Sequence, residues 1–129
     1  MAYFFSKTIE SDFEPALEQA KLALKSKGFG ILTSIDMQKT MQDKLEKTIG
    51  KYTILGACIP HFAYEALQKE ALIGLMLPCN VIVKESNRHG MIEIAAVDPV
   101  VSMQGIDNDE LKATAATVKE KLKSVIESL

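Results

Sequence analysis

Tryptophan is absent from this chain, aromatic residues make up only 6% of it, and cysteine occurs twice in 129 residues. So few aromatic rings leave little material for the platforms on which proteins stack single-stranded bases. Lysine and arginine together number 15 against 17 aspartate and glutamate residues, and the formal net charge is −2. Because nucleic-acid binding needs concentrated positive charge, we expect no nucleic-acid partner.

Long apolar runs are also missing. None approaches the ~20 residues that a membrane-spanning helix needs. The first residues, Met1–Lys7, carry no basic region followed by a long apolar stretch. The sequence therefore predicts neither a signal peptide nor a membrane partner. Two cysteines in a chain that is not exported are expected to be reduced thiols, which favours a cytoplasmic location.

The composition that remains is that of an ordinary globular protein. Hydrophobic residues make up 47% of the chain and charged residues 25%. At this length the sequence predicts a single domain over residues 1–129.

The order of strand and helix patterns predicts the fold class. Runs of β-forming residues predict strands over residues 3–8, 30–35, 52–57, 81–85 and 91–97. Helical spacing of apolar residues predicts one helix after each of the first three strands and one at the C-terminus. We expect Ile31, Thr33 and Ile35 to share one strand face, and the turn at 86–90 predicts a hairpin. The expected fold is α+β, with two layers: a mixed sheet of about five strands and helices packed mainly on one face.

Both cysteines lie in motifs of small residues at strand boundaries. Cys58 ends the run Gly56-Ala57-Cys58 and is followed by Pro60, which suits the first turn of a helix. Cys79 stands between Pro78 and Asn80 at the start of a strand. Glycine and proline at such boundaries are typical of places where the backbone approaches another group closely.

These motifs carry a family resemblance. The stretches Ile54–Cys58 and Ile73–Val81 closely resemble the domain-of-unknown-function 302 family, whose members are small bacterial and archaeal proteins. The likeness also includes Gly28–Asp36 and the pair Asp98-Pro99, so it extends from about the first strand to the final helix.

Two positions depart from the family pattern. Ile59 stands where asparagine is usual, so a ligand contact made by that asparagine in relatives would be lacking here. Ala71 and Leu72 follow Glu70 where the family typically has glutamate-proline ahead of the isoleucine-glycine pair. The resemblance implies a small α+β fold that tends to form a homodimer. It implies no established activity.

Our first hypothesis is a homodimeric module that binds a small ligand or an anion and has no catalysis of its own. No acid–base pair stands out, and the helix that begins at Pro60 offers free amides without a carboxylate beside them. The dimer contact would be supplied by the apolar seam of the last helix, or by the helix that carries Met37 and Met41. The seam consists of Leu111, Ala115, Val118, Leu122, Val125 and Leu129. The residues expected to form the site are Gly56, Ala57, Cys58, Pro60, His61, Pro78, Cys79 and Asn80.

Two alternatives stay open. Cys58 and Cys79, with His61 nearby, could serve a thiol-dependent enzyme or handle a soft metal. The spacing of the cysteines matches neither a zinc site built from Cys-x-x-Cys pairs nor a redox Cys-x-x-Cys, so we expect no bound metal and no cofactor. A purely structural interaction protein is the third hypothesis, in which the motifs only shape the fold.

Overall fold

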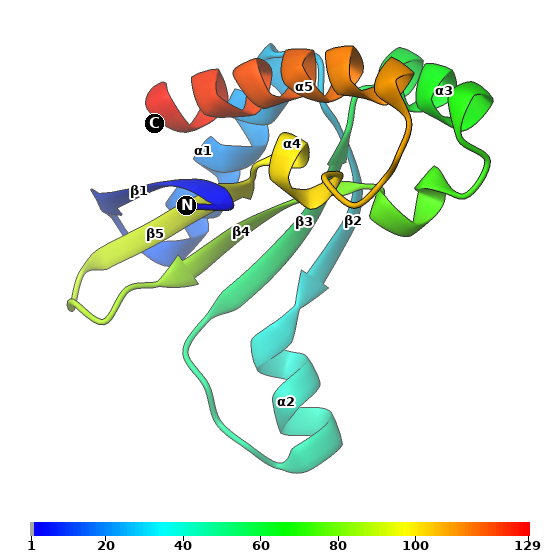
Figure 1. Ribbon diagram of the computed structural model, residues 1–129. Helices are drawn as coiled ribbons and strands as arrows, with labels where there is room; N and C mark the ends of the chain where they lie inside the picture. Colours follow the sequence, from blue (N-terminus) through cyan, green and yellow to red (C-terminus); the bar gives the residue numbers. More distant parts are fainter. Residues whose placement is uncertain (1) are drawn as a thin grey trace.

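The computed structural model describes residues 2–129 and contains one sheet with helices against it (Figure 1). The strands are β1 (Phe4–Glu10), β2 (Gly30–Asp36), β3 (Tyr52–Cys58), β4 (Cys79–Glu85) and β5 (Met91–Val97). The helices are α1 (Phe13–Ser26), α2 (Met37–Leu45), α3 (Pro60–Lys69), α4 (Pro99–Ser102) and α5 (Asp109–Glu127), with the 3-10 helix η1 (Ile73–Met76) between α3 and β4.

The α+β prediction is confirmed, with one correction to the sheet. The strand order is β1-β5-β4-β3-β2, and each neighbouring pair is antiparallel, so the sheet is not mixed. A mixed sheet would need a parallel crossover between neighbouring strands. Within residues 2–129, α1 is the one connection that joins two parallel strands, and it links the two opposite edges of the sheet.

One face of the sheet is covered by α1 and α5 (Figure 1). The apolar stripe that predicted the first helix is buried from Phe13 to Leu24, as helical spacing requires. The seam of α5 is likewise buried, at Leu111, Ala115 and Leu122 and on through its last turns. Because this seam packs inside its own fold, it is not available to contact a second copy.

A bulge in β2 changes which residues share a face. Ile31 pairs with Ala57 and Thr33 pairs with Gly56, so one residue between them has no counterpart on β3. The extra residue reverses the alternation, because successive strand residues point to opposite faces. Ile31 therefore packs against the main core, while Thr33 and Ile35 belong to the other face. The prediction that these three share a face is wrong.

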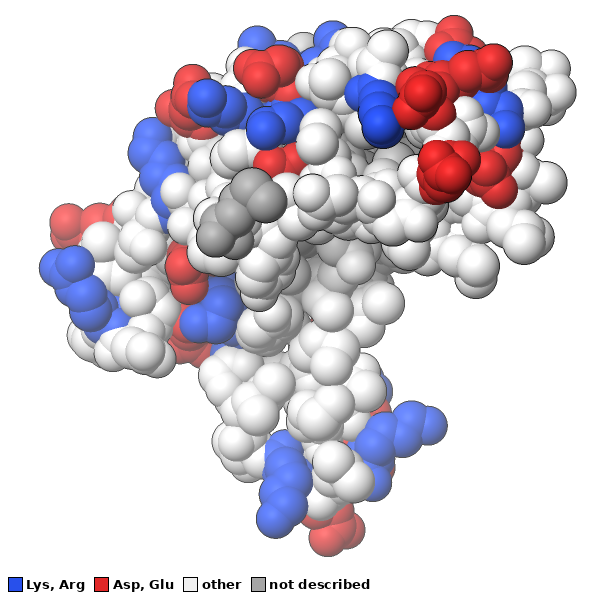
Figure 2. Space-filling view, in the orientation of Figure 1, with Lys and Arg blue, Asp and Glu red and all other residues white. Residues whose placement is uncertain are grey.

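The connection between β2 and β3 forms an arm, defined here as residues 37–51, that projects from the rest of the molecule (Figures 1 and 2). Its helix α2 has nine residues, and none of them is buried. Asp36 caps this helix by accepting a hydrogen bond from the backbone N–H of Lys39 at 3.0 Å. Helices this short are marginal in water on their own.

The side chains of Thr33 and Pro78 pack against Gly56 on β3. A Cβ atom at this position would overlap with Thr33 Oγ1 and would lie 2.6 Å from Pro78 Cγ. The glycine of the Gly-Ala-Cys motif therefore makes room for the proline of the Leu-Pro-Cys motif.

Asp98 joins three elements at one end of β5. It is only 5% exposed, and one carboxylate oxygen accepts a hydrogen bond from the N–H of Val100 at 2.9 Å, which caps α4. The other oxygen lies 3.4 Å from Lys119 Nζ on α5. The backbone N–H of Asp98 donates to the carbonyl oxygen of Tyr3 at 2.7 Å. These bonds fasten both α4 and α5 to the sheet.

None of the helices formed by residues 2–129 combines the length and the apolar character needed to cross a membrane.

We expect Gly56→Ala to lower the free energy of unfolding by roughly 1–3 kcal/mol, because the added methyl group forces Thr33 and Pro78 away from β3. Gly74→Ala is the matched control, since a Cβ atom there meets no atom within 4 Å. Urea denaturation measures both. Equal stability of Gly56→Ala and the original protein would contradict the packing argument.

We expect Asp98→Ala to lower the free energy of unfolding by about 1–3 kcal/mol, because it removes a helix cap and a buried partner of Lys119. Lys119→Met is expected to cost less, because the Lys119 side chain is 34% exposed and water weakens its ion pair. Urea denaturation of the two variants tests the ranking. A larger loss for Lys119→Met would show that the ion pair, and not the cap, carries the effect.

Candidate functional site

The two cysteine motifs meet at one end of the sheet. Strands β3 and β4 are antiparallel neighbours, and Ala57 at the end of β3 lies opposite Cys79 at the start of β4. The chain between them, through α3 and η1, leaves and returns to the same end of the sheet (Figure 1). The two motifs, which are 21 residues apart in sequence when counted from Cys58 to Cys79, therefore lie side by side in the fold.

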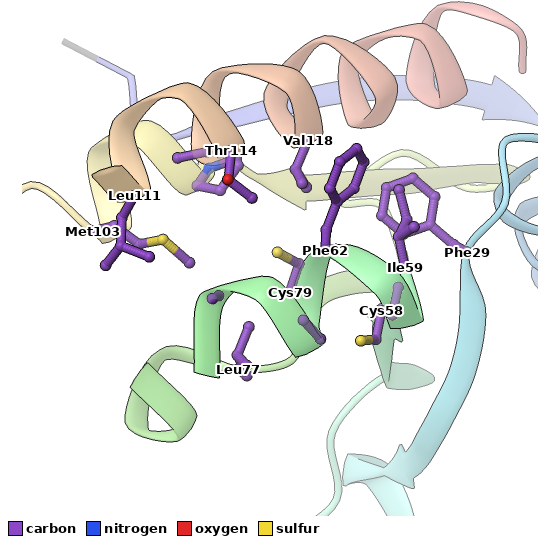
Figure 3. A pocket seen from close by; sticks show the side chains of 15 residues that line it. Phe29, Cys58, Ile59, Phe62, Leu77, Cys79, Met103, Leu111, Thr114 and Val118 are labelled. Atoms are coloured by element: carbon purple, nitrogen blue, oxygen red, sulfur yellow. The ribbon is translucent and has the colours of Figure 1, made fainter. Parts of the chain in front are cut away.

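A narrow apolar cleft lies beside this junction, between the strand ends, α3 and α5 (Figure 3). Its cavity volume is only about 40 Å³, and it is partly open to solvent. Its lining residues are Phe29, Ala57, Cys58, Ile59, Phe62, Ala63, Ala66, Leu77, Cys79, Pro99, Met103, Leu111, Thr114, Ala115 and Val118.

The thiols of Cys58 and Cys79 point in different directions at this cleft. Alternation along the paired strands puts Cys79 and Ala57 on the face that α1 and α5 cover, and directs Cys58 the other way. Figure 3 shows the sulfur of Cys79 on the side of α5 and that of Cys58 lower in the view, away from α5. Cys58 thus borders the cleft at its edge, where β3 runs into α3.

Burial raises the pKa of both thiols. Cys79 is 8% exposed, and burial, followed by the nearby Cys58, raises its pKa to about 11. Burial also raises the pKa of Cys58. Both side chains are therefore protonated near neutral pH, and the neutral form is the one that an apolar environment favours.

The other predicted site residues lie outside the cleft. Pro60 and His61 are exposed at the start of α3, and the ring of His61 lies against that of Phe62 with 4.2 Å between centroids. Gly56 and Asn80 pair with each other across β3 and β4 on the face opposite the cleft. Pro78 covers Gly56 on that same side. The structure therefore divides the predicted site between two faces of the sheet.

Most of the cleft comes from residues that the motifs did not indicate. Leu111, Thr114, Ala115 and Val118 reach it from α5, and Phe29 reaches it from the loop that precedes β2. The sequence signal for these residues is slight. It consists of the small Ala115 within a helical seam otherwise made of larger apolar side chains.

No group of three or more histidine, cysteine, aspartate or glutamate side chains within residues 2–129 is arranged to hold a metal ion.

Comparison with known proteins identifies the family but no activity. The chain matches the family described as "Domain of unknown function DUF302" over residues 5–129. It is also similar to the crystal structure of an uncharacterized conserved DUF302 protein from Bacillus stearothermophilus, with a TM-score of 0.89, 24% sequence identity and 98% of each chain covered. A search of functionally curated proteins finds no match. Since the family match covers nearly the whole chain, this protein belongs to the DUF302 family.

Proposed function

We propose that this protein binds a slim apolar small molecule in the cleft between α3, α5 and the ends of β3 and β4, without catalysis of its own. The proposal rests on the apolar composition of the cleft lining. No lining residue is charged, and the polar side-chain groups among them are the hydroxyl of Thr114 and the two thiols. Small-molecule sites are typically apolar clefts with a few polar groups that orient the ligand.

The shape of the cleft narrows the class of ligand. Figure 3 shows the rings of Phe29 and Phe62 toward one end of the lining, and Met103 and Leu111 toward the other. The small free volume between them leaves room for one thin group. An unbranched alkyl or acyl chain fits this description better than a fused ring system.

The anion of our first hypothesis has less support than an apolar ligand. Pro60, at the start of α3, has no N–H to donate and is not part of the cleft lining. A charged group moved into the apolar cleft would lose its hydration without gaining a charged partner.

The thiol hypothesis is also less well supported. Thiolates, not thiols, act as nucleophiles and metal ligands, and burial holds both cysteines in the thiol form. The purely structural hypothesis accounts for Gly56 and Pro78, which pack on each other, but not for the cleft on the other side of β3.

Ala115→Leu tests the proposed site, because a larger side chain on α5 fills the cleft from the helix side. We expect 1-octanol to shift the methyl NMR signals of Ala63 and Thr114 in the original protein and to raise its melting temperature. Ala115→Leu is expected to remove both effects while circular dichroism stays unchanged.

Ala113→Leu is the matched control, since it adds the same side chain to an exposed position of the same helix. It is expected to leave octanol binding intact. Stabilisation by inorganic phosphate but not by octanol would contradict the apolar assignment. Undiminished octanol binding by Ala115→Leu would remove this cleft as the site.

The thiol hypothesis is tested by alkylation with iodoacetamide across pH, followed by mass spectrometry of Cys58→Ala and Cys79→Ala. We expect slow labelling of both thiols at pH 7 and faster labelling of the more exposed Cys58. Because the pKa of Cys79 is raised to about 11, its labelling rate should continue to rise up to that pH. A rate that levels off below pH 8 at either cysteine would instead favour a reactive thiolate.

A further inference from the structure

A second hollow, called here the outer hollow, lies next to the cleft and shares three lining residues with it. Its volume is about 370 Å³, against about 40 Å³ for the cleft. The residues that line both spaces are Met103, Leu111 and Ala115. Those that line the outer hollow but not the cleft include Gln104, Asn108, Lys112 and Ala116. Figure 3 shows Met103 and Leu111 at one end of the cleft, so the outer hollow continues from that end.

Helix α5 places the two spaces side by side. It contributes three pairs of residues, and the members of each pair are four residues apart and so share one face of the helix. The pairs are Thr114 and Val118 in the cleft, Leu111 and Ala115 at both spaces, and Lys112 and Ala116 in the outer hollow. A thin molecule that lies across the middle pair would touch both spaces.

Met103 is the movable part of the wall between them. It is partly buried and packs with Leu111 in the small core cluster at this corner of the fold. A methionine side chain is unbranched and has three rotatable bonds, so it adapts readily to a new neighbour. A thin chain can therefore pass from the cleft into the outer hollow by displacing Met103.

The outer hollow offers a cation, which the cleft lacks. Lys112 is the one charged side chain among the residues of 2–129 that line either space. Its Nζ lies 2.9 Å from Oδ1 of Asp109, which is exposed and lies outside the lining. Because a lysine ammonium carries three donors, two remain for a ligand.

Two more polar side chains line the outer hollow. Asn108 is already engaged: its Oδ1 accepts a hydrogen bond from the N–H of Glu110 at 3.1 Å, and its Nδ2 donates to the carbonyl oxygen of Lys69 at 2.9 Å. Gln104 is exposed, so its amide can exchange water for a ligand oxygen. The donors that face a ligand here are therefore those of Lys112 and Gln104.

We propose that the ligand is a straight-chain fatty acid, with its hydrocarbon chain in the cleft and its carboxylate beside Lys112 in the outer hollow. This rests on the cleft being the ligand site, and adds which end group the ligand carries and where that end lies. The chain leaves water along an apolar surface, while the carboxylate stays partly hydrated next to a cation. Within the cleft the same carboxylate would have no charged partner.

Isothermal titration calorimetry with decanoate, decylamine and 1-octanol tests the end group. Decanoate should bind the original protein more tightly than decylamine, because Lys112 attracts a carboxylate and repels an ammonium group. Lys112→Glu should weaken decanoate binding about tenfold, since one attraction is lost and one repulsion is gained. It should leave octanol binding unchanged. A glutamate near the start of a helix is favourable, so the variant is expected to fold.

Lys123→Glu is the matched control, because it makes the same charge change at an exposed position of α5 that lines neither space. It should leave decanoate binding unchanged. Ala116→Leu fills the outer hollow from an exposed position and should weaken decanoate but not octanol. In methyl NMR spectra, decanoate should shift the signal of Ala116, and octanol should not.

The octanol measurements separate this proposal from the one on which it rests. Octanol binding together with equal decanoate affinity in Lys112→Glu and Lys123→Glu would overturn the outer hollow as the carboxylate site and leave the cleft as the ligand site. Tighter binding of decylamine than of decanoate would overturn it as well. A protein that binds neither octanol nor decanoate would remove both proposals.

Discussion

The register of the β3–β4 pair determines what most other features of this protein can do. Because Ala57 lies opposite Cys79, alternation directs both side chains toward the cleft and leaves Gly56 and Asn80 on the opposite face of the sheet. A slip of one residue would exchange these two sets. The packing of Pro78 over Gly56 opposes such a slip, since the proline ring fits only where no Cβ atom is present.

The conspicuous motifs are therefore explained by packing in the first place. Gly56 admits Pro78, and Asp98 caps α4 and holds Lys119 of α5. Both features fix the end of the sheet at which β3, β4 and α5 meet. The cleft lies between these fixed elements, so its lining is positioned by the motifs even though most of it is contributed by residues outside them.

Local patterns were sufficient to predict the strands, the main helices and the α+β class, because alternation and helical spacing report directly which side of an element is buried. They were not sufficient for the bulge in β2, which separates Ile31 from Thr33 and has no composition signal of its own. Nor could spacing show that Cys58 and Cys79 point to different faces, since that depends on the pairing of two strands distant in sequence. Phe29 and Thr114 reach the cleft only through tertiary packing.

The cleft and the paired side chains of Ile54 and Ile82 lie on opposite faces of the same two strands, β3 and β4. The two faces nevertheless share a backbone: Cys79 lines the cleft, and Asn80, the next residue, belongs to the opposite face. A ligand that displaced the ends of β3 and β4 would therefore move side chains on both faces of the sheet together.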